Sequence, residues 1–247
     1  MWVRFLLAVP TVTINTPMNI GFYGHSNCAY RSPDSFIDLI AERFNANIVN
    51  IGVRQGSEER ILFKLKKTKY LDLAVVFHAE PGFTFLPNCD RDVDLTRISY
   101  QRIEYLMEQE DWSSDFLESH TPVFKKEFET KEKFIEASNI FKKHFYHRDL
   151  ILNRYYGALM QIDRFLCDRK IPVLHVLSES NSVPHWFEFK SGPVDFDIMK
   201  LCDTYKSKQS FFVNLITKEG NQAVADLLEK KLRSCLVAQA PGSSPVS

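Results

Sequence analysis

Apolar strands and amphipathic helices alternate along this chain, and the alternation is what most limits the folds open to it. Apolar runs at 18–24, 47–53 and 71–79 are separated by segments with helical spacing at 32–46 and 56–69. A strand, a helix and a strand in succession form parallel pairs joined by right-handed crossovers. The order therefore predicts a three-layer α/β fold, in which a flavodoxin-like parallel sheet carries helices on both faces.

Several of the predicted helices have clear end signals. The first is predicted to begin with Ser32 as its N-cap and Pro33 at its first position. The segment at 56–69 has glutamates at its start and lysines at its end, an order that complements the helix dipole. The last helix is amphipathic over 217–234, and Thr217 is predicted to cap it.

The chain shows no internal repeat and no linker that would split it. We expect a single α/β domain over 18–236, with a helical insertion at 95–170 before a fourth core strand at 171–178. The first 17 residues are expected to form a poorly ordered extension. Residues 237–247 are small, polar and proline-bearing, which is typical of a disordered tail.

The start of the chain leaves two alternatives open. A cleaved signal peptide is disfavoured, because the apolar run from Phe5 to Val9 is short and Pro10 interrupts it. The other interpretation is that Met18, directly before the first strand, is the working start. No run approaches the roughly 18 apolar residues of a membrane span, so we expect none.

The charge balance and the cysteine content indicate which partners and which cellular compartment to expect. Thirty-one basic residues balance 31 acidic ones, so no overall field attracts nucleic acid, and none is expected as a partner. The five cysteines are widely spaced and form no CxxC pair. That usage predicts reduced thiols and a cytoplasmic location.

Polar residues follow each of the first three predicted strands. Ser26 comes after the first strand, Gln55 and Gly56 after the second, and His78 and Glu80 after the third. Because the carboxyl ends of parallel strands meet at one edge, we expect these residues to line a cleft there. A serine in that position can face a ligand, and a glycine lets a backbone N–H act as an oxyanion donor. The alternative is that all three segments are ordinary turns.

Four stretches in this order resemble the sequence blocks of the SGNH (GDSL-type) hydrolases. They are GFYGHSNCA, NIVNIGVRQGSEER, DLAVVFHAEP and NLITKEGNQAVADLL, and the resemblance covers about 18–232. It implies a serine ester or acyl hydrolase that needs neither cofactor nor metal. It also implies Ser26 as the nucleophile, oxyanion donors in the second and third blocks, and a late histidine as the general base.

The chain departs from that family at the positions that carry the chemistry. His25 stands at the family's aspartate, and Glu80 at the donor asparagine. Gly56 lies at the second-block glycine or one place beyond it, since ungapped counting puts Gln55 there. Leu215 occupies the place of the base histidine. A leucine cannot take a proton from serine, and an ionised carboxylate repels an oxyanion, so the triad is broken on this alignment.

Two histidines are candidate replacement bases. His25 adjoins Ser26, although neighbouring side chains at a turn usually diverge. His78 could reach across the cleft to Glu80 or to a ligand, or could simply be a loop residue satisfied by backbone. His175 lies in the middle of the fourth predicted strand, which favours a core histidine over a ligand.

Two further motifs contain residue types that can bind metal, but neither is expected to form a metal site. His144 and His147 are predicted to share a helical face at i and i+3, and we interpret that face as solvated. The aspartates at 87–94 lack the glycine and the final glutamate of a calcium loop, so we interpret this stretch as a capped turn.

Two functional hypotheses remain. The first is an SGNH-like ester or acyl hydrolase that uses Ser26. The second is a catalytically inactive binding or regulatory protein with the same fold, which keeps the cleft for a small ligand. The sequence indicates neither a substrate nor an oligomeric state.

Overall fold

The computed structural model describes most of the chain outside its ends and its centre. The described residues are 17–24, 26–29, 31–53, 56–81, 83–84, 93–94, 147–178, 183–206 and 216–238, with single positions at 133, 136, 139, 140, 143 and 144. Residues 1–16 of the predicted extension, 239–247 of the predicted tail and 95–132 of the predicted insertion lie outside these residues. Residues 237 and 238, predicted as the start of the disordered tail, are instead the last two residues of a helix.

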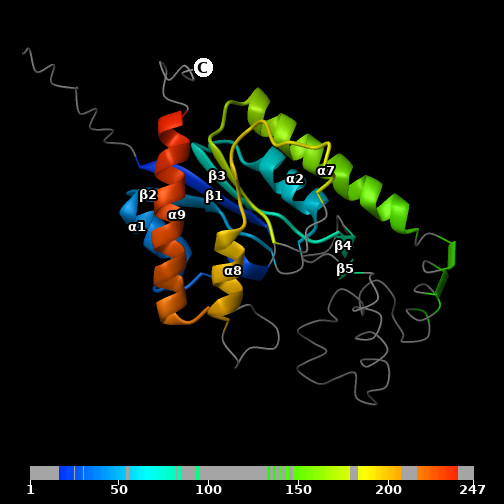
Figure 1. The fold of residues 1–247 in the computed structure, drawn as a ribbon, viewed down its shortest axis with the longest axis horizontal. Coiled ribbons are helices and arrows are strands. Elements are labelled where there is room, and N and C mark those ends of the chain that lie inside the picture. The colour runs from blue at the N-terminus through cyan, green and yellow to red at the C-terminus, as the bar shows by residue number, and fades with distance from the viewer. Residues whose placement is uncertain are drawn as a thin grey trace, which may run out of the picture.

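A five-stranded parallel sheet forms the middle layer (Figure 1). Its strands are β1 (Met18–Gly24), β2 (Ala46–Asn50), β3 (Leu73–Phe77), β6 (Val173–Val176) and β7 (Val194–Asp195). The order in the sheet is β2-β1-β3-β6-β7, and each neighbouring pair is parallel. The direction of strand addition reverses between β1 and β3, which is the flavodoxin-like arrangement. The predicted fold class is confirmed.

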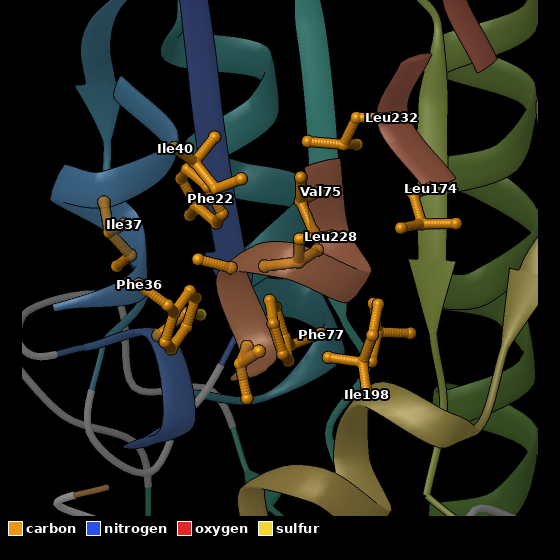
Figure 2. Packing of buried hydrophobic residues seen from close by; sticks show 14 of the residues in the cluster. Phe22, Phe36, Ile37, Ile40, Val75, Phe77, Leu174, Ile198, Leu228 and Leu232 are labelled. Carbon is orange, nitrogen blue, oxygen red and sulfur yellow. The ribbon is translucent and has the colours of Figure 1, made fainter. Parts of the chain in front are cut away.

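Helices cover both faces of this sheet (Figure 1). One face packs against α1 (Phe36–Arg43), α8 (Asp197–Thr204) and α9 (Lys218–Ala238). The other packs against α2 (Glu58–Lys67) and α7 (Arg148–Asp168). Alternation along the strands divides the core accordingly: Phe22, Val75 and Leu174 point to the first face, as Figure 2 shows, and Tyr23 and Val76 belong to the second cluster.

The ends of the helices bear out some of the sequence predictions. Glu58 and Glu59 begin α2, and the Thr217 hydroxyl accepts from the N–H of Gly220, so both of these predictions are confirmed. The predicted cap of α1 is wrong. The carbonyl of Ser32 instead closes a turn with the N–H of Ser35.

Ser35 is the actual N-cap of α1. Its hydroxyl oxygen accepts from the N–H of Asp38 at 3.3 Å and its hydroxyl donates to the Asp38 carboxylate at 2.8 Å. This reciprocal contact fixes the first turn at Phe36, three residues later than the sequence suggested.

Some elements were not predicted. β7 and α8 follow the fourth predicted strand, and a two-stranded antiparallel sheet joins β4 (Phe83–Thr84) to β5 (Val93–Asp94). The interpretation of 87–94 as a capped turn is therefore wrong at its last two residues, which pair as a strand.

The two histidines near the start of α7 do not share a helical face. His147 is the N-cap of α7 with extended backbone angles, because the helix begins only at Arg148. His144 and His147 are both exposed, as expected for a solvated surface. In the part of the chain that the structure describes, no set of three or more His, Cys, Asp or Glu side chains is placed to hold a metal ion. None of the described helices combines the length and apolar character needed to cross a bilayer.

Candidate functional site

The chain turns sharply where β1 ends. Gly24 has φ near 147°, and a Cβ at this residue would lie 2.4 Å from the carbonyl oxygen of Phe77 on β3. Only glycine fits both the backbone angle and the close approach of the two strands. The 3₁₀ turn η1 (Ser26–Cys28) begins two residues later, so the backbone of Ser26 lies at the carboxyl end of β1, beside the switch point of the sheet.

The loop after β2 is hydrogen-bonded to this turn. The N–H of Val53 donates to the carbonyl of Gly24 at 2.9 Å, and the N–H of Gly52 donates to the carbonyl of Cys28 at 2.8 Å. A Cβ on Gly56 would lie 3.0 Å from the Gly24 carbonyl oxygen. The first two loops therefore meet at one edge, as the sequence predicted.

The remaining predicted site residues are only partly described. His25, Gln55 and Leu215 lie outside the described residues, as does the side chain of Ser26. Gly56 is buried, and its N–H donates to the carbonyl of Val53 at 3.0 Å. To serve as an oxyanion donor, this N–H would have to share or leave that hydrogen bond.

The third loop does not have the pairing that the sequence suggested. Glu80 is exposed, whereas His78 is buried and contacts the Glu58 carboxylate at the start of α2. The distance from His78 Nδ1 to Glu58 Oε2 is 3.1 Å. The other oxygen of Glu58 accepts from the N–H of Ala79 at 2.6 Å. One carboxylate thus holds both the ring and the backbone of this loop.

His78 begins a line of hydrogen bonds that crosses the sheet on its α2 and α7 side. His78 Nε2 lies 2.9 Å from Nδ1 of His175, and Nε2 of His175 lies 2.8 Å from the Ser191 hydroxyl. That hydroxyl donates to Asp163 of α7 at 2.6 Å. Glu58, His78, His175, Ser191 and Asp163, here named the buried chain, are each at most 6% exposed.

The far end of the buried chain is the buried carboxylate of Asp163, which accepts hydrogen bonds from protein donors instead of water. Asp163 accepts from the hydroxyl and the N–H of Ser191, the latter at 2.8 Å, and from the N–H of Lys190 at 3.0 Å. Asp163 is therefore held by three donors, two of them backbone N–H groups.

His175 is enclosed by rings and apolar side chains. Phe189 stacks on it with ring centroids 4.0 Å apart, and the His78 ring lies 5.1 Å away on centroids. Burial holds the pKa of His175 well below 6.5, and the electrostatic influence of the neighbouring His78 lowers it further. The prediction of a core histidine is confirmed, and the ring remains neutral near pH 7.

A pocket of about 310 Å³ opens beside Ser191, where α7 ends and the chain enters β6. It is lined by Leu166, Cys167, Lys170, Lys190 and Ser191. Desolvation raises the pKa of Cys167, the electrostatic influence of Asp163 and Asp168 raises it further, and Lys190 lowers it. The charged residues that line the pocket are its two lysines.

The described thiols do not offer an alternative nucleophile at this edge. Cys28 follows Ser26 in η1 and is fully buried, and desolvation strongly raises its pKa. Burial likewise raises the pKa of Cys202 to about 12. Thiols in this state stay protonated at neutral pH and are inert. The four described cysteines are free thiols, in agreement with the sequence prediction.

Sequence reasoning singled out two members of the buried chain and missed three. Glu58 has the appearance of an ordinary acidic residue in a first turn, and Asp163 lies within an amphipathic helix. Ser191 sits in an irregular segment. The available signal was the placement of His78 directly after one apolar strand and of His175 within another, because a buried imidazole requires partners for both nitrogens.

Comparison with known proteins adds no identification. No family model and no curated protein sequence matches the chain.

Proposed function

We propose that this protein is an SGNH-like α/β protein whose Ser26 edge takes a small ester or acyl compound, in the lineage of serine ester and acyl hydrolases. The observation that carries the proposal is the backbone at the switch point. β1 ends at Gly24, a position that only glycine can occupy, and the turn that follows begins at Ser26. In flavodoxin-like sheets, ligands bind at this point.

The packing of the second loop supports the same proposal. A Cβ added to Gly56 would lie only 3.0 Å from the Gly24 carbonyl oxygen, so the backbones of the two loops come close together at one edge. Backbone N–H groups in such positions stabilise the oxyanion of acyl transfer. Gly56 would contribute after leaving its present bond to Val53.

A second function, ligand binding without turnover, is favoured by the state of the histidines. Both ring nitrogens of His78 and both of His175 are occupied within the buried chain. Neither ring is available as a base unless the chain breaks. Serine without a base reacts slowly near pH 7, and neither His78 nor His175 can supply that base while the buried chain is intact.

Labelling with a fluorophosphonate probe tests the proposal. An activated Ser26 should be modified, and Ser26→Ala should lose the label while Ser234→Ala, a change at an exposed serine of α9, keeps it. A folded protein that is not labelled, but whose thermal midpoint rises with p-nitrophenyl acetate analogues that cannot react, would favour binding without turnover. Labelling at another serine, or no response of either kind, would contradict the proposed site.

A further inference from the structure

Two lysines from separate segments of the chain line one pocket. Lys170 follows the end of α7, Lys190 precedes β7, and both border the cavity of about 310 Å³ beside Ser191. The other lining residues, Leu166 and Cys167, carry no formal charge. Because Lys170 comes just before β6, the pocket lies toward the amino end of that strand, whereas the candidate site described above lies at carboxyl ends of strands.

Neither lysine has a carboxylate partner in the part of the chain that the structure describes. Two acids influence Cys167 of the pocket, namely Asp163 and Asp168. Asp163 is buried and its oxygens are engaged by three donors. Asp168 forms a surface ion pair with Arg164 at 3.6 Å. The ammonium groups of the two lysines are therefore left to face whatever enters the pocket.

The backbone that carries each lysine is anchored. The N–H of Lys190 donates to the Asp163 carboxylate at 3.0 Å. Two residues later, a Cβ on Gly192 would collide with the carbonyl oxygen of Val173, so this segment packs tightly on β6. The N–H of Lys170 is held by a carbonyl of the last turn of α7 at 3.0 Å. Binding a ligand would therefore order two side chains but no backbone, which keeps its entropic cost low.

The backbone conformation of Lys170 is unusual for a lysine. Its φ is 52°, and it directly follows Arg169, the C-cap of α7, where helices that end in this way most often have glycine. The N–H groups of Lys170 and Ile171 donate to the carbonyls of Cys167 and Leu166 and so complete the Schellman motif. Glycine adopts this conformation at lower cost. Residues held in such conformations occur preferentially at functional sites.

We propose that this pocket binds a small phosphate monoester, with its phosphate group between Lys170 and Lys190 and its carbon skeleton against Leu166. A phosphate monoester carries about 1.5 to 2 negative charges near pH 7, which complements two ammonium groups better than a single carboxylate does. Lysine binds phosphate as a point charge and needs no planar, two-pronged geometry. The volume of about 310 Å³ is at the small end of ligand pockets and suits a compact ester.

Calorimetric titration of the full chain with phenyl phosphate at low ionic strength tests the proposal. Lys170→Gln and Lys190→Gln should each weaken binding about tenfold or more, because each removes a charge-assisted contact. Lys230→Gln is the matched control: it removes an exposed lysine of α9, on the other face of the sheet, and should bind as the wild type does. No saturable binding by the wild type, or equal affinities in all four proteins, would overturn the proposal.

Lys170→Gly separates binding from folding. Glycine suits the left-handed conformation, so this variant should unfold at a thermal midpoint no lower than that of the wild type and still lose affinity as Lys170→Gln does. Asn45→Gly is its control, since Asn45 has φ of 46° after the end of α1 and should not affect binding. Wild-type affinity in a folded Lys170→Gly protein would contradict the proposed site.

The thiol of Cys167 reports whether the ligand occupies this pocket. Its alkylation by N-ethylmaleimide, followed by mass spectrometry of the peptide that contains it, should slow when phenyl phosphate covers the thiol. Phenol, which lacks the charge, should protect little, and inorganic phosphate should protect less than the ester because it does not reach Leu166. An unchanged rate at saturating phenyl phosphate would overturn the site. Equal protection by inorganic phosphate at the same concentration would overturn the assignment of an ester.

Discussion

Replacing His175 with glutamine should make the protein less sensitive to acid. In the folded protein, burial and the electrostatic influence of His78 hold the pKa of His175 well below its usual value. In the unfolded chain, a histidine titrates at about 6.5. Below that pH the unfolded chain therefore binds a proton at position 175 that the folded protein does not, so unfolding takes up a proton and stability falls as the pH falls.

The size of the effect follows from this single difference. At about pH 5 the unfolded histidine is almost fully protonated, and linkage gives a loss of about 2 kcal/mol relative to about pH 7.5. For a domain of this size, that corresponds to a fall in thermal midpoint of about 4–8 °C. Glutamine cannot titrate, while its amide can still donate to Ser191 and accept from His78.

The assay is urea unfolding at about pH 5 and about pH 7.5. For each protein, the loss of unfolding free energy between the two pH values is measured, and these losses are then compared. His175→Gln should lose about 2 kcal/mol less stability on acidification than the wild type does. His185→Gln is the control, because His185 is exposed on a turn and its removal should leave the wild-type acid loss unchanged. An identical acid loss in His175→Gln and the wild type would refute the reasoning, since it would mean that His175 titrates alike in the folded and unfolded states.

Two more predictions concern backbone geometry. Gly24→Ala should lower the free energy of unfolding by about 3–5 kcal/mol, because the new Cβ would lie 2.4 Å from the Phe77 carbonyl oxygen and φ is unfavourable for alanine. Gly157→Ala in α7 should raise it by about 0.5–1 kcal/mol, since a Cβ there meets no described atom within 4 Å. Denaturant midpoints of the two variants check both, and a tolerated Gly24→Ala would contradict the tight β1–β3 approach. Thr217→Ala should lower stability by about 1 kcal/mol through loss of the α9 cap, and Thr217→Ser should restore it. A thermal midpoint for Thr217→Ser as low as that for alanine would show that the hydroxyl is not the stabilising group.

The fold could be predicted because its main signals are local. Each of the first three strands is a short apolar run, and the helices between them repeat apolar residues with helical period. β7 escaped prediction because Val194 and Asp195 are only two residues and have no period to detect. α1 was placed three residues early because Ser32 and Ser35 both fit a cap, and only the contact of Ser35 with Asp38 decides between them.

The site could be predicted only in part, for a different reason. The edge formed by the loops after β1 and β2 follows from strand order, which the sequence indicates. The buried chain depends on residues 58, 78, 163, 175 and 191, which no spacing rule connects. Their meeting is a product of the packing of α2 and α7 on the same face of the sheet.

The buried chain and the Ser26 edge are joined through one side chain. Glu58 follows Gly56 by two residues, and its carboxylate holds the N–H of Ala79, the residue before Glu80. The same carboxylate lies 3.1 Å from Nδ1 of His78. One side chain at the start of α2 therefore links the end of the second loop to the backbone of the third. A change such as Glu58→Gln, which keeps these bonds while removing the charge, should leave the loop geometry intact, so any effect that it has on ligand binding at Ser26 would report electrostatics at this edge rather than a displaced loop.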